Sequence, residues 1–519
     1  MKKKVSSTRR GFLKDVVQFG TVLTVATGCK SLDSPVAAFE NSNDSTSAEG
    51  ASFLLPDNLN PANFILHGRS PLTLETKRSK MGVAALTPTD LLFVRNNLPL
   101  PDKSFVEHPQ NWTLAIDGVV EKAVLKIQDL KQIGLETIVA VLQCSGNGRG
   151  FFSHQPAGSP WKTGAAGCVM WTGVSVSDVV RYLGGVKGDA KYLTATGGEV
   201  LPDGVDPLKA TVERSIPIGK AMDDCLLAWE LNGNPIPISH GGPLRLIVPG
   251  YYGCNQIKYV KSISFAQNES TVKMQKSSYR IRPIGEKGSP VQPSMWQMNV
   301  KSWINGPGTD GKPLLNGNIV FFGVAFSGGS RITKVEYSTN DGESWSSAEI
   351  FGPDLGKYGW RTFRFSLHLS PGTHTISTRA TDDMGETQPR HRVENHRGYA
   401  NNSWSDLSIT VQIVSSLTQV STDNNVDFEP QNVQTVPFSQ KAKEGRGVFL
   451  ESNCGTCHHL NDADAEGQVG PNFNQLKPSP QQVQDAVRHG VGIMPAYGDA
   501  FSPEQLEALS QYIFEAAKK

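Results

Sequence analysis

The chain has 519 residues, a formal net charge of +1 at pH 7 and 38% hydrophobic residues. At about 100–200 residues per domain, this length predicts roughly three domains, each large enough to bury a core. Residues 1–29 hold six basic residues and one acidic residue, so the remaining chain carries about −4. This mildly acidic balance argues against nucleic acid as a partner.

The first 29 residues have the pattern of an export signal. The stretch STRRGFLK places a twin arginine after a basic N-terminus, and a mildly apolar run from Val16 to Gly28 follows. That run is too short to span a bilayer as a helix, so we predict a twin-arginine signal over residues 1–29 and a periplasmic protein. A disordered basic tail is the plainer alternative. The sequence ATGC before residue 30 also resembles a lipoprotein cleavage site, which leaves a lipid anchor at Cys29 as an open alternative.

Residues 30–55 are rich in Ser, Asn and Asp, and this composition predicts a flexible spacer. Residues 56–280 then mix strand-like stretches, such as WTLAIDGVV and LRLIVPGYYG, with helix-like stretches such as VSVSDVVRYLG. We predict that this region is an α+β domain.

Residues 290–414 have the pattern of strands alone. In WRTFRFSLHL, Phe363, Phe365 and Leu367 alternate with polar residues, as in a strand with one buried face. The stretch ITKVEYSTNDGESW places an Asn-Asp-Gly turn between two strand-like runs, which is a hairpin signal. Several short strands over about 120 residues predict a β-sandwich.

Residues 415–440 are polar and contain scattered prolines, which predicts a linker. The remaining residues, 441–519, predict a separate helical domain. Its last segment, SPEQLEALSQYIFEAAKK, carries Leu506, Leu509 and Tyr512 at helical spacing, as expected of an amphipathic helix.

The C-terminal domain contains the attachment pattern of a c-type haem. Cys454 and Cys457 are three positions apart and His458 follows at once, so the thiols would bind the haem and the imidazole its iron. A structural zinc site or a redox cysteine pair needs no adjacent His. Met494, in a loop rich in Gly and Pro, is the predicted second axial ligand of a small class I cytochrome c.

The stretch LQCSGNGRGFF, residues 142–152, raises a separate question about Cys144. Within these residues the thiol could be a packing residue, a nucleophile, half of a disulfide or a metal ligand. Six segments in order decide between these roles: LLFVRNNLPLPD, QCSGNGRGFF, SPWKTGAAG, LLAWELNG, SHGGPLRLIVPGYYGCNQIKYVKSI and ENHRGYANNSW. Together they resemble the sulfite oxidase family of molybdopterin enzymes, over roughly residues 55–414.

The resemblance implies a multidomain protein: a sulfite-oxidase-type α+β molybdopterin domain, an immunoglobulin-like β-sandwich that makes homodimers, and the all-α cytochrome c domain. It implies that Cys144 is the thiolate ligand of molybdenum. The implied pterin contacts are Phe93, Val94, Arg95, Asn96, Asn97, His240, Arg245, Gln256, Ile257 and Lys258. An acidic contact falls near Asp203 or Asp206, where the alignment is loose.

The implied substrate pocket is formed by Arg95, Arg149, Trp161 and Arg397. Arginine presents a planar fork of donors that stays charged, which suits a small oxyanion such as sulfite. Any one of these arginines alone would be interpreted as a surface residue. The resemblance further implies that electrons pass through the haem to an external cytochrome c or terminal oxidase.

Two departures from the family pattern concern the chemistry. Asn97 stands where the family usually has His, and Trp229 stands in a motif whose Tyr lies at the active site in the family. An indole donates one hydrogen bond but is larger than a phenol, so the substrate itself is in question. Related alternatives are a molybdenum oxidoreductase that acts on sulfane sulfur or another oxyanion, and an electron-transfer module with a decayed molybdenum site. The other cysteines, Cys168, Cys225 and Cys254, are expected to be buried thiols or to include one disulfide.

Overall fold

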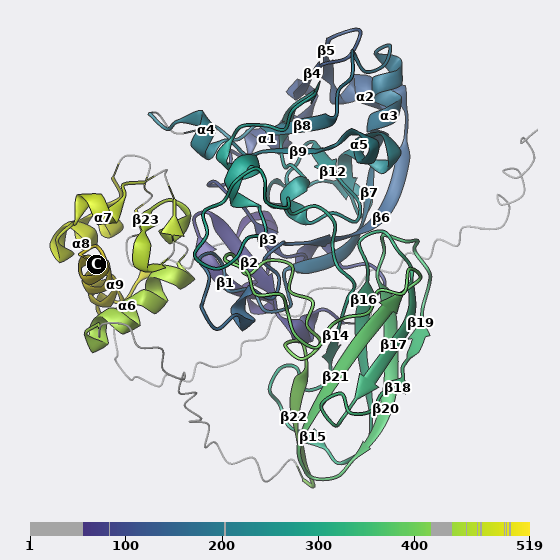
Figure 1. The fold of residues 1–519 in the computed structure, drawn as a ribbon, viewed down its shortest axis with the longest axis vertical. Coiled ribbons are helices and arrows are strands. Elements are labelled where there is room, and N and C mark those ends of the chain that lie inside the picture. The colour runs from purple at the N-terminus through teal and green to yellow at the C-terminus, as the bar shows by residue number, and fades with distance from the viewer. Residues whose placement is uncertain are drawn as a thin grey trace, which may run out of the picture. The chain divides into compact units, whose positions relative to one another are not determined.

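The computed structural model describes residues 55–82, 84–201, 204–416, 438–452, 454–463, 465–467, 470–491, 494, 496–497 and 500–518. The predicted signal, most of the spacer and linker, and Asp203 lie outside these residues. Figure 1 shows three folded regions along the described chain: an α+β region, a sheet-rich region and a helical C-terminal region. Among the described residues, no helix has the length and apolar character needed to cross a membrane.

A small antiparallel sheet begins the α+β region. Its strands are β1 (Phe64–Arg69), β2 (Leu72–Thr76) and β3 (Val94–Arg95), in the order β1-β2-β3. β2 is buried along its whole length, and Leu74 lies opposite Val94 in the register with β3. This sheet therefore fixes the backbone of Arg95 against a buried strand.

Two five-stranded sheets form the body of the α+β region. The first has the order β11-β10-β7-β6 with β12 also paired to β10, and its strands are β6 (Glu136–Gln143), β7 (Ala166–Ser175), β10 (Leu226–Leu231), β11 (Asn234–Pro235) and β12 (Arg245–Ile247). The second has the order β5-β4-β13-β8-β9, and its strands are β4 (Thr113–Asp117), β5 (Ala123–Lys126), β8 (Tyr192–Gly197), β9 (Glu213–Pro217) and β13 (Val260–Ala266).

Short helices cover these sheets: α1 (Ser104–Glu107), α2 (Ile127–Ile133), α3 (Val176–Tyr182), α4 (Pro207–Ala210) and α5 (Ile218–Asp224). The Ser175 side chain caps α3 by accepting from the backbone N–H of Asp178. Val176, Val179 and Val180 of α3 then face a core of Leu, Ile and Val side chains. The prediction that VSVSDVVRYLG contains a helix is confirmed.

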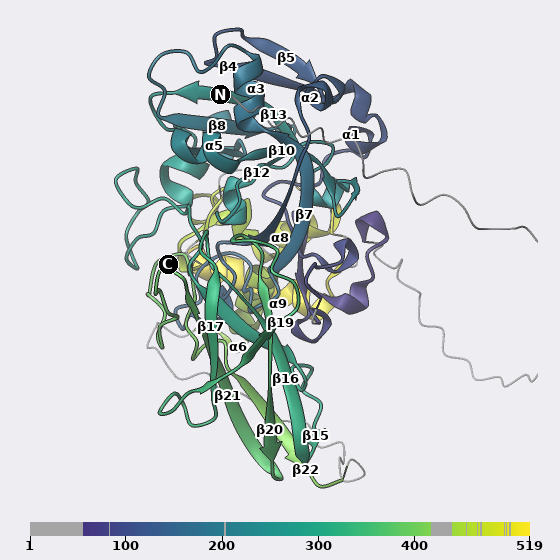
Figure 2. The same cartoon turned by 90° about the vertical axis from the view of Figure 1, so that its right-hand side faces the viewer.

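The sheet-rich region is a sandwich of two sheets. One sheet has the order β14-β16-β20-β19, with β14 (Lys301–Gly306), β16 (Gly317–Phe326), β19 (Glu349–Phe351) and β20 (Arg361–Leu369). The other has the order β15-β22-β21-β17-β18, with β15 (Leu314–Leu315), β17 (Ile332–Ser338), β18 (Ser346–Ser347), β21 (Gly372–Asp382) and β22 (Ile409–Val414). The long strands run side by side in both views (Figures 1 and 2).

The two sequence patterns in the sandwich are confirmed. Phe363, Phe365 and Leu369 of β20 are buried in the sandwich core while Arg364 is exposed. β17 and β18 form an antiparallel hairpin, with Asp341 and Gly342 of the predicted turn at φ of 55° and 82°. These left-handed backbone angles are the ones that Asp-Gly turns favour.

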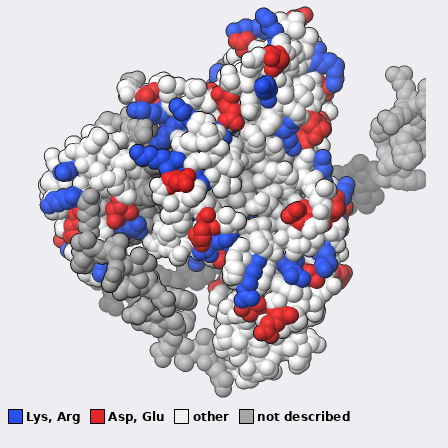
Figure 3. Space-filling model, viewed as in Figure 1, with Lys and Arg blue, Asp and Glu red and all other residues white. Residues whose placement is uncertain are grey.

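The C-terminal region is helical and also contains one very short hairpin. Its helices are α6 (Gln440–Glu451), α7 (Phe473–Leu476), α8 (Pro480–His489) and α9 (Pro503–Ala516), and its hairpin is β23 (His459–Leu460) with β24 (Ala465–Glu466). Leu506, Leu509 and Tyr512 of α9 are buried in one cluster with Phe449 of α6. The predicted amphipathic helix is therefore confirmed. On the molecular face drawn in Figure 3, acidic and basic side chains are mixed, as expected of a chain with balanced charge.

Candidate functional site

Cys144 lies in a tight loop directly after β6. Its backbone N–H donates to the oxygen of Ala165 at 2.9 Å, and its own oxygen accepts from the N–H of Asn147 at 3.0 Å. Gly148 has φ of 107°, and a Cβ at this position would meet the Asn401 side chain at 2.8 Å. The loop therefore needs glycine at this position, and its geometry presents the thiol of Cys144 at the end of a buried strand.

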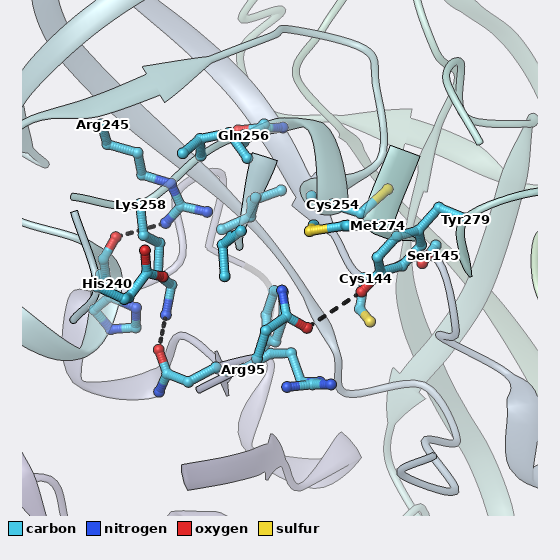
Figure 4. A pocket seen from close by; sticks show the side chains of 18 residues that line it. Arg95, Cys144, Ser145, His240, Arg245, Cys254, Gln256, Lys258, Met274 and Tyr279 are labelled. Carbon is cyan, nitrogen blue, oxygen red and sulfur yellow. Dashed lines mark hydrogen bonds between the residues drawn. The ribbon is translucent and has the colours of Figure 1, made fainter. Parts of the chain in front are cut away.

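A pocket of about 670 Å³ opens beside Cys144. Nine of the predicted cofactor contacts line it together with Cys144: Phe93, Arg95, Asn96, Asn97, His240, Arg245, Gln256, Ile257 and Lys258. Figure 4 shows His240, Arg245 and Lys258 on one side of the pocket and Cys144 with Tyr279 on the other. Segments that are far apart in the sequence thus converge on one cavity.

Two further contacts implied by the resemblance do not line this pocket. Val94 is fully buried and packs with Leu74 in the core of the small sheet. Asp206 caps α4 by accepting from the N–H of Leu208 at 3.0 Å. The other acidic position, Asp203, is outside the described residues.

Three nitrogen groups at one end of the pocket repel each other. Burial and the neighbouring charges of Lys258 and Arg245 hold the pKa of His240 well below its usual value. Burial, followed by the charge of Arg245, holds the pKa of Lys258 well below its usual value, and burial lowers that of Arg245 to about 10. Such a cluster is stabilised when an anion lies between its members.

Several buried polar atoms of the same wall have no hydrogen-bond partner within the described protein: His240 Nε2, Arg245 Nε and Gln256 Oε1. Buried polar groups are nearly always satisfied, so these atoms indicate a bound polar group. The phosphate and pterin ring of a molybdopterin supply an anion together with donors and acceptors. The residues of this pocket therefore fit that cofactor, and Cys144 supplies a soft thiolate for its metal.

A second pocket shares the Cys144 thiol with the first and is lined by the three predicted arginines, Arg95, Arg149 and Arg397. Arg149 is 6% exposed, and its Nε donates to the main-chain oxygen of Arg397 at 2.8 Å. Its Nη1 donates to the oxygen of Ser159 at 3.2 Å. Burial lowers the pKa of Arg149, and the nearby Arg397 adds to this effect.

The structure corrects the prediction for Trp229. This residue lies at an irregular position of β10, where the register with β7 shifts between Ala228 and Glu230. Its ring packs into the core of the α+β region and contacts the Lys131 ammonium, and it lines neither pocket. The bulge turns the side chain away from the site, so its indole does not replace a phenol there.

Trp161 also lines neither pocket. It is fully buried and packs edge-on against Phe93, with ring centroids 6.1 Å apart, and Phe93 lines the cofactor pocket. The indole therefore supports the pocket wall from behind.

Sequence reasoning missed Tyr279 and Tyr399, which both line the pocket of the arginines. Tyr279 O–H donates to Asn97 Oδ1 at 3.4 Å, so Asn97 and a phenol meet at this site. Burial raises the pKa of Tyr279 well above its usual value, so the phenol stays protonated and can donate. Tyr279 lies outside the six segments of the resemblance, whereas Tyr399 lies within ENHRGYANNSW, a signal that could have pointed to it; the fold brings the two rings together.

Three main-chain oxygens of the Cys144 loop accept hydrogen bonds from the 301–401 region. Ala400 N–H donates to the Ser145 oxygen at 3.0 Å. Lys301 Nζ donates to the Asn147 oxygen at 2.9 Å, and Asn401 Nδ2 donates to the Gly148 oxygen at 3.0 Å. The loop is thus fixed by three hydrogen bonds from the 301–401 region.

The remaining cysteines of the α+β region are free thiols in the described structure. Cys168 and Cys225 are buried, and burial raises the pKa of Cys168 to about 12. Cys254 lines the cofactor pocket, where its Sγ donates to the oxygen of Met295 at 3.6 Å. These residues were expected to be reduced thiols or to include one disulfide, and the structure agrees with the reduced thiols.

The haem motif forms a short turn after α6. His458 is 7% exposed, its ring stacks on Phe473 with centroids 4.3 Å apart, and its Nδ1 lies 3.1 Å from the oxygen of Pro471. A carbonyl at Nδ1 favours the tautomer that leaves Nε2 free for a metal. Gly470 leaves room beside the imidazole, because a Cβ there would lie 2.4 Å from it.

Met494 is partly buried and packs against the same core cluster as Cys454. Burial raises the pKa of the Cys454 thiol to about 12, so this thiol lies in apolar surroundings. An apolar niche with two thiols, one imidazole and a thioether fits a covalently bound haem c.

Family models match three successive parts of the chain. Residues 98–274 match the oxidoreductase molybdopterin binding domain, and residues 292–412 match the Mo-co oxidoreductase dimerisation domain. Residues 440–513 match cytochrome C oxidase, cbb3-type, subunit III.

Individual relatives agree with these matches. The chain is 28% identical to mitochondrial sulfite oxidase of Rattus norvegicus over 367 residues, which are 67% of this chain and 65% of that one. It is 29% identical to the NAD(P)H nitrate reductase of Hordeum vulgare over 381 residues, 68% of this chain and 42% of that one. The matched part thus spans just under two thirds of the rat protein.

Among solved structures, the sulfane dehydrogenase SoxCD from Paracoccus pantotrophus aligns with a TM-score of 0.58 and 25% identity, covering 72% of this chain and 96% of that one. The fold, the Cys144 pocket and the haem motif define a molybdopterin-dependent oxidoreductase that also carries haem c. Residues 98–412 thus match two domain models of molybdopterin oxidoreductases and are similar to sulfite oxidases, and a cytochrome domain lies at the C-terminal end of the chain.

Proposed function

We propose that the chain oxidises sulfite to sulfate and passes the electrons through its own haem to an external acceptor. The observation that carries this proposal is the convergence of Arg95, Arg149 and Arg397 on the pocket that contains Cys144. Guanidinium groups carry planar forks of charged donors, so a pocket lined by three of them suits a small oxyanion such as sulfite.

Different residues of the chain serve the cofactor, the anion and the haem. The wall of His240, Arg245 and Lys258 would hold the anionic part of the pterin, and Cys144 would hold the metal. When bound, the molybdenum cofactor supplies oxygen transfer and accepts two electrons. The arginines would bind and orient the anion, and the protonated phenol of Tyr279 could donate to it by turning away from Asn97 Oδ1. His458 and Met494 would hold the iron of a haem c, which supplies one-electron transfer when bound.

The direct test is to add sulfite to the oxidised protein and to follow the haem absorption band. Cys144→Ser should keep the haem spectrum, yet sulfite should no longer reduce the haem, because a hydroxyl is a harder and far less acidic ligand. Dithionite should still reduce the haem of this variant directly. Cys225→Ser is the matched control, because Cys225 is a buried thiol that lines neither pocket. Normal sulfite-driven reduction in Cys144→Ser would contradict the proposal.

A second candidate substrate is sulfane sulfur. The likeness to the sulfane dehydrogenase structure favours it, because that alignment covers 72% of this chain. Steady-state rates with sulfite, thiosulfate, a protein-bound persulfide and nitrate separate these reactions. Preference for the persulfide would replace sulfite as the substrate. A molybdenum content near zero, in protein from a host that makes molybdopterin, would instead indicate a decayed site.

The location and the partners follow from other features. The twin-arginine pattern of residues 1–29 supports export to the periplasm as a folded protein with its cofactors. The match of residues 292–412 to a dimerisation domain supports a homodimer, and a monomer in light scattering at micromolar concentration would contradict it. The haem domain supports a soluble cytochrome c or a terminal oxidase as the acceptor.

A further inference from the structure

Four side chains form one continuous stack at the wall of the arginine pocket. The Tyr279 and Tyr399 rings are stacked, with centroids 5.5 Å apart and planes at 15°. The guanidinium of Arg149 lies 5.3 Å from the centroid of Tyr399. The guanidinium of Arg214 lies 5.6 Å from the centroid of Tyr279. A cation therefore lies against each of the two tyrosines.

Tyr399 is held firmly within this stack. It is 3% exposed, its N–H donates to Asn395 Oδ1 at 2.9 Å, and Asn395 Nδ2 donates to its oxygen at 2.9 Å. Its phenol donates to the Ser278 oxygen at 3.4 Å, next to Tyr279. The ring thus has a fixed orientation, and it ties the backbone before Tyr279 to the backbone after Arg397.

The partners of the two arginines are neutral. In the described structure Arg149 donates to two main-chain oxygens, and Arg214 donates to Asn255, Ser294 and the Met274 oxygen. No carboxylate of the described residues forms an ion pair with either guanidinium. A carboxylate would fix Arg149 but would also neutralise it, whereas an aromatic face attracts the cation and leaves its full charge.

From this arrangement we infer that Tyr399 is a positioning residue that sets oxyanion affinity, because it orients Arg149 and Tyr279 toward one anion without cancelling the charge of Arg149. The inference rests on the proposed function for the identity of the anion. Tyr399 itself acts through its neighbours and takes no part in the chemistry.

The experiment compares Tyr399→Phe, which keeps the ring, with Tyr399→Leu and Tyr399→Met, which remove it and keep an apolar side chain. The matched control is Tyr337→Leu, which removes a ring stacked at 4.2 Å on Phe365 in the sandwich. The first readout is the dissociation constant of sulfate for the oxidised holoenzyme, measured by calorimetry and normalised to molybdenum content. The second readout is the pair of kcat and KM for sulfite.

We expect Tyr399→Leu and Tyr399→Met to weaken sulfate binding by about ten-fold or more, the change that about 1.4 kcal/mol represents. KM for sulfite should rise by a similar factor, and kcat should change less. Tyr399→Phe and Tyr337→Leu should stay within about two-fold of the wild type. In an Arg149→Gln background, removal of the Tyr399 ring should have little further effect, because the ring acts through Arg149.

Equal sulfate affinity in the Phe and Leu variants would overturn the inference, and so would full additivity with Arg149→Gln. A wild-type protein that does not bind sulfate would overturn it as well. If sulfite fails to reduce the wild-type haem while the ring-dependent sulfate binding persists, the proposed substrate is wrong and the role of Tyr399 stands.

Discussion

Lys301 Nζ donates a 2.9 Å hydrogen bond to the main-chain oxygen of Asn147, three residues after the predicted metal ligand Cys144. Lys301 is 2% exposed, and burial lowers its pKa to about 7. The carboxylate of Asp406 and the thiol of Cys144 oppose this shift. A lysine that changes charge near neutral pH therefore lies behind the metal-binding loop.

This relationship predicts a pH-dependent effect on the molybdenum centre. A nearby cation stabilises the more negative, reduced state of a metal site, so Lys301→Gln should lower its reduction potential. Because the wild-type ammonium loses its proton as pH rises through about 7, the difference should be large near pH 6 and small near pH 9. Potentiometric titration at both pH values measures it, with the exposed Lys334→Gln as control. A difference that does not change with pH would contradict the prediction.

Removal of the Glu75 carboxylate should have a large effect on stability. Its Oε1 accepts from the N–H groups of Lys162, Thr163 and Gly164 at 2.9–3.0 Å, and its Oε2 lies 2.7 Å from His67 Nε2. Glu75 is 2% exposed, so Glu75→Ala leaves three buried donors unpaired and should cost about 3–5 kcal/mol.

Denaturant unfolding followed by tryptophan fluorescence measures this cost. The matched control is Glu349→Ala, which breaks the exposed pair with Arg364 and should change the unfolding midpoint little. If both variants unfold at the same midpoint, the Glu75 carboxylate does not hold the loop of residues 162–164.

The sequence predicts the cofactor pocket well and the substrate side less well, for a physical reason. His240, Arg245 and Lys258 belong to one continuous motif, so placing that motif places all three residues. Trp229 was placed at the active site by resemblance to a family motif, whereas its ring packs in the core beside a register shift of β10, which a motif match does not reveal.

Tyr399 and Tyr279 show a second limit of prediction from the sequence. They are 120 positions apart, only Tyr399 lies in a segment of the resemblance, and their stacking depends on how two irregular segments pack. The same holds for Lys301, whose contact with Asn147 joins the start of β14 to the loop after β6. Local patterns specify strands, turns and motifs, whereas such contacts follow only from the complete fold.

The buried carboxyl of Glu199 should make the stability of the protein without its molybdenum cofactor depend on pH. Glu199 lines the cofactor pocket, and burial raises its pKa to about 7, against the opposing charge of Lys258. Between its ordinary pKa and about 7, the folded chain therefore binds more protons at this site than the unfolded chain. The contribution of Glu199 to the free energy of unfolding falls as pH rises through this window.

Glu199→Gln should remove this fall, since an amide does not titrate. Denaturant midpoints of the cofactor-free protein near pH 5 and near pH 7.5 test it, with the exposed Glu121→Gln as control. The variant should lose less stability than the wild type between the two pH values. An equal loss in both proteins would show that Glu199 ionises normally.

Met494 provides the last prediction, which concerns the haem. Its thioether packs in the cluster that contains Cys454, while His458 is fixed from the other direction by Pro471 and Phe473. A thioether ligand favours ferrous haem, so Met494→Ala should lower the haem reduction potential by about 0.1 V or more, within the roughly 0.8 V that axial ligands span. Potentiometric titration of the haem band measures this shift.

Molybdenum content should not change in Met494→Ala, because no residue of the cofactor pocket is altered, but turnover with an external acceptor should slow. Met384→Ala is the matched control, since Met384 is 76% exposed on the sandwich. An unchanged potential in Met494→Ala would mean that another residue occupies the second axial position. In that case Met494 would serve packing alone, and another side chain near His458 would be the second ligand of the haem iron.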